Sequence, residues 1–97
     1  MNAPQMSHDP HGYGRLKDFL GEIERILAAS GNETESQLVH HAGLFFGGGS
    51  PSEFLGEARL ALLSTLHSAH DVPVELVERI HQMICAIDEG FRDVGGA

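Results

Sequence analysis

The sequence predicts an all-α protein that folds as a single four-helix bundle in antiparallel, up-down-up-down order. Four segments repeat apolar residues at three- and four-residue steps, the period of a helix with one buried face. No segment sustains the alternation expected of a strand. The connections, at about 30–33, 47–50 and 70–72, are short enough to favour antiparallel neighbours. A looser pair of helical hairpins is the alternative arrangement.

The 97 residues suffice for one domain, which we expect to span residues 13–93. Residues 1–12 contain two prolines and two histidines without an apolar period, and predict a flexible leader. Residues 94–97 predict a frayed tail. We see no secretory signal and no apolar run near the roughly 20 residues that cross a bilayer. These patterns are typical of a cytoplasmic protein.

The first helix is expected to run from about Tyr13 to Ala29. At about 100° per residue its apolar side chains share one stripe, with Tyr13 at the edge. Gly31 follows as a C-terminal cap. The stripe comprises Leu16, Phe19, Leu20, Ile23, Ile26 and Leu27.

The second helix should begin at Asn32 or Thr34. Each is followed three residues later by Glu or Gln, which predicts a capping box. The glycines at 47–49 should end the helix, because glycine stabilises a helix poorly. The expected apolar side comprises Leu38, Val39, Ala42, Phe45 and Phe46.

The third helix has a well-defined predicted start. Ser50 can act as the cap, Pro51 suits the first helical position, and Glu53 completes a capping box. We expect the helix to continue to about Ala69. Its broad apolar arc comprises Phe54, Leu55, Ala58, Ala61, Leu62, Thr65, Leu66 and Ala69.

The fourth helix is predicted to follow Asp71 as its cap and Pro73 at the first helical position. It should end near Phe91 or Arg92. Its apolar stripe comprises Leu76, Val77, Ile80, Met83, Ile84, Ile87 and Phe91.

The formal charge of −8, from six basic and fourteen acidic residues, argues against direct nucleic-acid binding. Some acids lie at predicted helix starts, where the helix dipole favours each by about 0.3–1 kcal/mol. The remaining acids form either a solvated surface or a face that docks on a basic partner protein. The candidate partner-binding acids are Glu22, Glu24, Glu57 and Glu78.

The row His81, Cys85 and Asp88 lies within about 60° on one edge of a helix. It could supply metal ligands or an activated thiol, but a second element would have to complete a metal site. His67 and His70 could join it across the turn. Alternatively, these two histidines lie at the C-terminus of a helix because the helix dipole favours them there. The cysteine would then pack simply as a small hydrophobic side chain.

No catalytic or cofactor-binding motif is complete, since GxSxG, HExxH, Walker and CxxC patterns are missing. We therefore expect neither enzyme activity nor a cofactor. The single cysteine excludes an internal disulfide. Leu60 and Leu63 lie outside the apolar arc of their helix. They are either buried because that helix is central, or part of a surface for a dimer or partner.

A resemblance to known proteins rests on the segment from Ser50 to Glu57, the Ala/Leu helix after it, and the helical pair at 20–27 and 38–46. It is similar in outline to small acidic all-helical bacterial proteins of the immunity type and to small uncharacterised bacterial proteins. Together with the acidic face, this resemblance favours a non-enzymatic inhibitor or immunity-type protein, whose basic partner would be a toxin or a nucleic-acid-binding enzyme. A homodimeric helical regulator or adaptor, and a histidine-based metal-binding protein, are the alternative hypotheses.

Overall fold

A computed structural model describes residues 13–93, with side chains as far as Gly90. The predicted leader and tail, residues 1–12 and 94–97, lie outside the described residues. Within 13–93 the chain is all-helical, without strands, which confirms the predicted class. No helix in this range is both long and apolar enough to cross a membrane. The helices are α1 (Tyr13–Ala29), α2 (Glu33–Gly43), α3 (Pro51–Ser68) and α4 (Val74–Asp93).

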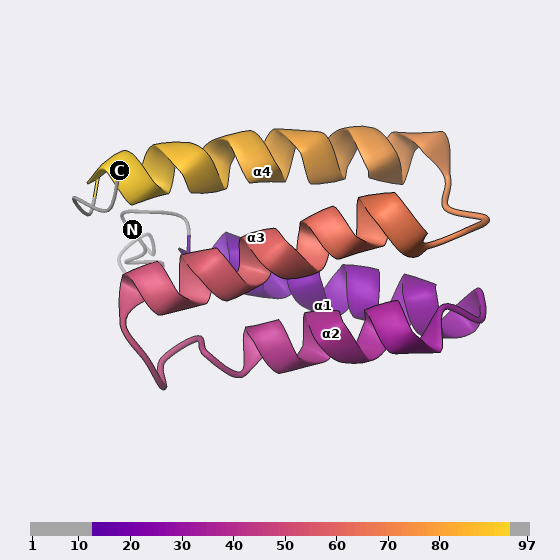
Figure 1. The fold of residues 1–97 in the computed structure, drawn as a ribbon, viewed down its shortest axis with the longest axis horizontal. Helices are drawn as coiled ribbons and strands as arrows, with labels where there is room; N and C mark the ends of the chain where they lie inside the picture. The colour runs from indigo at the N-terminus through magenta and orange to yellow at the C-terminus, as the bar shows by residue number, and fades with distance from the viewer. Residues whose placement is uncertain (1–12, 94–97) are drawn as a thin grey trace, which may run out of the picture.

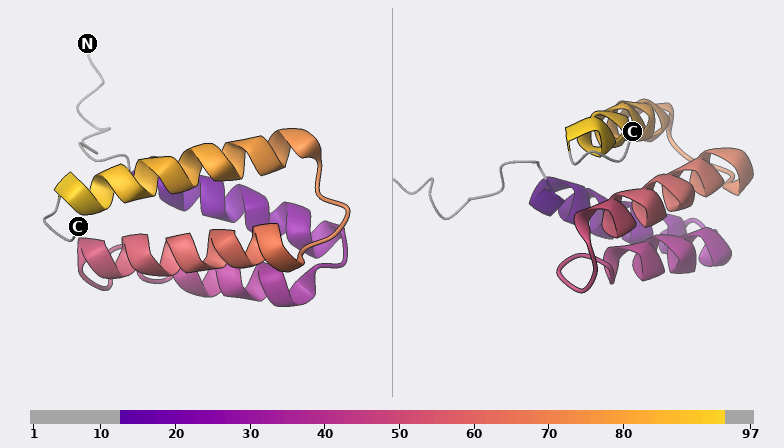
Figure 2. Two further views of the ribbon diagram at one scale, coloured as in Figure 1. Left: turned by 45° about the horizontal axis from the view of Figure 1, so that its top comes forward. Right: turned by 60° about the vertical axis from the view of Figure 1, so that its left-hand side comes forward.

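The chain reverses direction at each of its three connections (Figure 1). Helices that follow one another in the sequence pack against each other. α3 lies in front of α1, with α2 on one side and α4 on the other, as the two further views also show (Figure 2). The core receives side chains from all four helices, including Leu20, Ile23, Leu27, Val39, Phe54, Leu62, Ile80 and Ile87.

The end of α1 agrees with the prediction. Gly31 adopts a positive φ of 82°, a conformation that costs glycine little. The N–H of Asn32 donates to the carbonyl of Leu27 at 2.8 Å, and the N–H of Gly31 donates to the carbonyl of Ala28 at 3.3 Å. These are the two bonds of a Schellman motif, and they satisfy the carbonyls of Leu27 and Ala28 near the end of α1.

The predicted capping box at the start of α3 is confirmed. Ser50 Oγ accepts from the Glu53 N–H at 3.1 Å, and the Ser50 N–H donates to Glu53 Oε1 at 3.1 Å. Pro51 occupies the first helical position, as expected. A Cβ at position 49 would lie 2.7 Å from Glu53 Oε1, so Gly49 leaves room for this carboxylate.

The predicted end of α2 was wrong. The helix ends at Gly43, before the glycine run at 47–49. The N–H groups of Phe45 and Phe46 donate to carbonyls three residues earlier, at 3.2 and 3.1 Å, so the chain tightens into turns. This change lets the ring of Phe46 pack against Phe54 of α3 instead of continuing the α2 stripe.

The predicted cap of α4 was also wrong. Asp71 has a φ of 59°, a left-handed conformation that an N-cap does not use but that Asp tolerates in turns. The carbonyl of Pro73 accepts from the N–H groups of Leu76 and Val77, at 3.0 and 3.1 Å. Pro73 therefore directly precedes α4, which begins at Val74.

Candidate functional site

The site is organised by Asn32, which precedes α2 and is only 2% exposed. Its side chain makes no capping bond, contrary to the prediction, and reaches the connection between α3 and α4 instead. Asn32 Nδ2 donates to the His70 carbonyl at 2.8 Å and to Ser30 Oγ at 2.9 Å. Asn32 Oδ1 accepts from the His70 N–H at 3.0 Å. One buried amide thus satisfies both backbone polar groups of His70, and we call this arrangement the Asn32 clamp.

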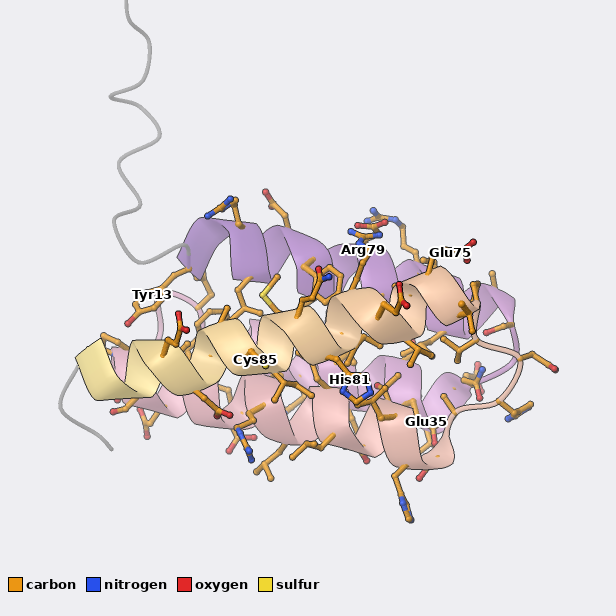
Figure 3. All side chains as sticks on the ribbon, turned by 90° about the horizontal axis from the view of Figure 1, so that it is seen from above. Tyr13, Glu35, Glu75, Arg79, His81 and Cys85 are labelled. Carbon is orange, nitrogen blue, oxygen red and sulfur yellow. The ribbon has the colours of Figure 1, made fainter. Side chains whose placement is uncertain are left out.

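The Asn32 clamp joins the connections at 30–32 and 69–73, which lie at one end of the domain (Figure 1). We call this end the clamp end. Figure 3 shows Glu35 and Glu75 toward it. Arg25, His67 and His70 also lie at this end, but its five acidic side chains outnumber the single arginine. None of the acids at this end forms an ion pair in the part of the chain that the structure describes: Glu33, Glu35, Asp71, Glu75 and Glu78.

Glu22, a predicted partner contact, is bound within the fold. Both of its carboxylate oxygens accept from the guanidinium of Arg79, at 2.9 and 2.8 Å. This guanidinium also lies 5.0 Å from the ring centroid of Phe19. The hydrogen bonds from Arg79 hold the pKa of Glu22 below its ordinary value, and the same bonds raise the pKa of Arg79. Glu22 thus connects α1 to α4.

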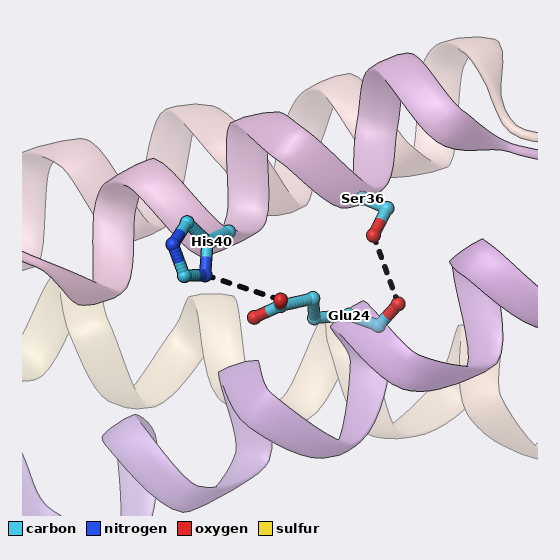
Figure 4. Close-up of polar contacts among 3 residues, drawn as sticks. All are labelled: Glu24, Ser36 and His40. Atoms are coloured by element: carbon cyan, nitrogen blue, oxygen red, sulfur yellow. Dashed lines mark hydrogen bonds and ion pairs between the residues drawn. The ribbon is translucent and has the colours of Figure 1, made fainter.

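Glu24 lies on a different side of α1 and faces α2 (Figure 4). Its Oε2 is 3.1 Å from His40 Nδ1, and its backbone carbonyl accepts from Ser36 Oγ at 3.0 Å. Glu22 contacts α4 whereas Glu24 contacts α2, so the structure does not bring these two acids onto one surface.

The other predicted contacts lie on α3 and α4. Leu60 is 62% exposed and Leu63 is 37% exposed, so both face solvent rather than the core. Glu57 shares α3 with them and is half-buried. Glu78 is exposed on α4 and belongs to the clamp end. The predicted partner-binding residues therefore do not form one surface. Three lie on α3, Glu78 lies at the clamp end, and Glu22 and Glu24 each contact a neighbouring helix.

The row on α4 does not form a cluster. His81 and Cys85 are exposed (Figure 3), whereas Asp88 Oδ1 accepts from Arg59 Nε at 2.7 Å and joins α4 to α3. Within residues 13–93, no three His, Cys, Asp or Glu side chains are grouped so that they could hold a metal ion. The histidines at 67 and 70 are exposed and do not complete such a group.

The opposite end, which we call the aromatic end, contains a pocket of about 240 Å³ beside the glycine run at 47–49. The rings of Tyr13 and Phe46 meet Phe54 edge to face, with centroids 6.3 and 5.4 Å away. The N–H groups of Gly48 and Gly49 both donate to the Phe45 carbonyl at 3.2 Å. The walls of this pocket are therefore mainly apolar rings and loop backbone.

Comparison with known proteins identifies no relative. No family model matches the chain, and no curated protein and no solved structure matches it either.

Proposed function

We propose that this chain is a non-enzymatic, cytoplasmic protein-binding module of the inhibitor or immunity type, whose clamp end docks on a basic partner protein. The supporting observation is the group of five carboxylates around the Asn32 clamp, none of which is ion-paired among the described residues. Uncompensated charge of one sign speeds association with an oppositely charged surface and disfavours other partners. We also propose an antiparallel up-down-up-down bundle, because this helix order brings the connections at 30–32 and 69–73 to the same end.

The position of these acids keeps their cost to stability low. Glu33 and Glu35 lie in the first turn of α2, and Glu75 lies in the first turn of α4. The helix dipole favours a carboxylate at each position by about 0.3–1 kcal/mol. The dipole interactions of these three acids therefore offset part of the repulsion among the acids at this end. In the sequence, four of these acids are accounted for by their positions at helix starts, and only Glu78 is a candidate partner contact. The Asn32 clamp joins the two connections beside them.

The Asn32 clamp would also make the surface efficient in binding. Its bonds to His70 fix the relative position of two connections that carry or precede the acids. A surface that is already ordered loses less conformational entropy when a partner binds. A toxin or nucleic-acid-binding enzyme fits this chemistry, because proteins that bind phosphate backbones carry Lys and Arg patches.

The test is capture of a partner from the source lysate at about 50 mM and about 500 mM salt, conditions between which screening differs strongly. The bait carries either Glu75→Lys with Glu78→Lys, or the control pair Asp18→Lys with Glu89→Lys. Asp18 and Glu89 are also exposed, and they lie nearer the aromatic end. Both pairs change the net charge equally.

We expect the unmodified bait to capture a basic protein at low salt and to lose it at high salt. The pair at the clamp end should abolish capture, and the control pair should retain it. Capture that is insensitive to salt, equal loss in both pairs, or no specific partner would contradict the proposal.

A further inference from the structure

We infer that the solvent face of α3 pairs with the same face of a second copy, antiparallel, across a two-fold axis at Leu60. This inference does not rest on the proposed docking of the clamp end, because it uses a different surface. The α3 face is defined as Glu53, Gly56, Glu57, Leu60, Leu63, Ser64 and His67.

The α3 face carries apolar side chains that the other described residues leave uncovered. Leu60 is 62% exposed and Leu63 is 37% exposed, whereas Leu62, on the other side of the helix, is fully buried. When a helix is apolar on two sides, one side packs against the core and the other exposes an apolar strip to solvent. Such an exposed strip is typical of an interaction surface. No other helix lies in front of α3 in Figure 1, and the exposure of Leu60 and Leu63 leaves this strip accessible to a second helix.

The polar groups on the α3 face select a second copy as its partner. Glu53, Leu60 and His67 are spaced by seven residues, about two helical turns, and so lie in one row. When two copies pair antiparallel about Leu60, Glu53 of each copy lies opposite His67 of the other. A carboxylate can accept a hydrogen bond from an imidazole N–H at both ends of the contact. A parallel pairing would instead place Glu53 opposite Glu53 and Glu57 opposite Glu57, so complementarity requires the closed, antiparallel two-fold arrangement.

The residues between Glu53 and His67 permit a close approach. Gly56 and Ser64 flank Leu60 on the two edges of the contact, and their small size suits helix packing at about 8–10 Å. Leu63 would lie over Gly56 of the second copy, on the same edge of the contact. The row spans about 21 Å of helix, so the contact is smaller than the roughly 800 Å² per partner of a standard interface. The dimer is therefore weak and depends on concentration.

The first test is sedimentation of the purified chain from about 10 µM to about 1 mM, the range in which a small interface forms. The weight-average mass should rise from monomer toward dimer. Leu60→Glu places two carboxylates together on the axis and should weaken self-association by about a hundredfold. Leu44→Glu is the matched control, because Leu44 is also 62% exposed, and it should have no effect. A strict monomer, or equal weakening by both substitutions, would overturn the inference.

The second test locates the axis and keeps the inference falsifiable if Leu60→Glu misfolds. In a Cys85→Ser background, Leu60→Cys should form a disulfide-linked dimer under mild oxidation, because only a residue on the axis meets its own copy. Leu44→Cys is again the control and should remain uncrosslinked. Folding of each variant is checked by circular dichroism. If Leu44→Cys crosslinks as readily as Leu60→Cys, the proposed pairing is wrong. Neither test involves lysate or the clamp-end acids, so failure here leaves the proposed docking untouched.

Discussion

The two ends of the helical domain are closed by opposite kinds of contact. At the clamp end a polar side chain is buried: Asn32 is 2% exposed and bonds to both backbone groups of His70. At the aromatic end the rings of Tyr13 and Phe46 meet Phe54, and a pocket of about 240 Å³ remains. The connection at the aromatic end is also the longest, from 44 to 50.

The difference shows how the type of contact controls what an end can do. Hydrogen bonds depend strongly on angle and distance, and a buried group without one costs about 1–3 kcal/mol. The Asn32 clamp therefore specifies one arrangement, which suits the display of a fixed pattern of charge. Edge-to-face rings tolerate centroid distances of about 4.5–7 Å. The aromatic end can consequently adjust its loop and keep unfilled space.

Replacement of Asn32 should have the largest effect. Asn32→Ala removes three side-chain hydrogen bonds and leaves the backbone groups of His70 without these partners. We expect the free energy of unfolding to fall by about 2–4 kcal/mol, measured by urea denaturation with circular dichroism. Ser30→Ala is the control and should cost less than about 1 kcal/mol, because Asn32 would keep both bonds to His70. Similar losses in the two variants would show that the Asn32 clamp is not the main polar contact at this end.

Removal of a ring at the aromatic end should cost less. Phe46 is 42% exposed, and its centroid lies 5.4 Å from that of Phe54. Phe46→Ala should lower the free energy of unfolding by about 2 kcal/mol, from lost burial and the edge-to-face contact. Leu44→Ala in the same connection should change it by at most about 0.5 kcal/mol. A cost for Phe46→Ala equal to that of Asn32→Ala would remove the distinction between the ends.

Two glycines allow the same backbone strain to be applied at each end. Gly31 has φ 82° and Gly47 has φ 79°, and a Cβ added at either would meet nothing within 4 Å. Each change to Ala therefore reports backbone strain of about 1 kcal/mol, unless the loop relaxes. We expect the full cost at Gly31, which the Schellman bonds hold, and about half of it at Gly47. Thermal unfolding measures both, and equal costs would contradict the greater adaptability of the aromatic end.

The smallest effect concerns the pair Glu22–Arg79. Because the folded pKa of Glu22 is below its ordinary value of 4.5, its contribution is present above that pH and is lost as the pH falls through the folded pKa. Arg79→Gln should raise the pKa of Glu22 toward 4.5, observed by NMR titration of the carboxyl group. Arg59→Gln, which removes the contact to Asp88, should leave the titration of Glu22 unchanged. An unchanged pKa in Arg79→Gln would show that the pair is not maintained in solution.

Local features of the sequence predicted most of the fold and little of the site. The apolar stripe placed α1 at Tyr13–Ala29, and the Ser50 capping box placed the start of α3. Both depend on residues within a few positions of one another. The role of Asn32 was not predicted, because its partner is 38 positions away and its spacing to Glu35 resembles a cap. The grouping of acids at the clamp end was missed for the same reason, since it depends on which connections meet.

The 38-residue separation between Asn32 and His70 also bears on folding kinetics. The amide joins the turn of the first helical hairpin to the turn of the second, so we expect its bonds to form only after both hairpins have folded and docked. Contacts that form late are weak in the transition state and slow unfolding more than they speed folding. Stopped-flow measurements on Asn32→Ala should therefore show faster unfolding at a nearly unchanged folding rate. A single buried amide would then determine how long the folded chain persists rather than how quickly it forms.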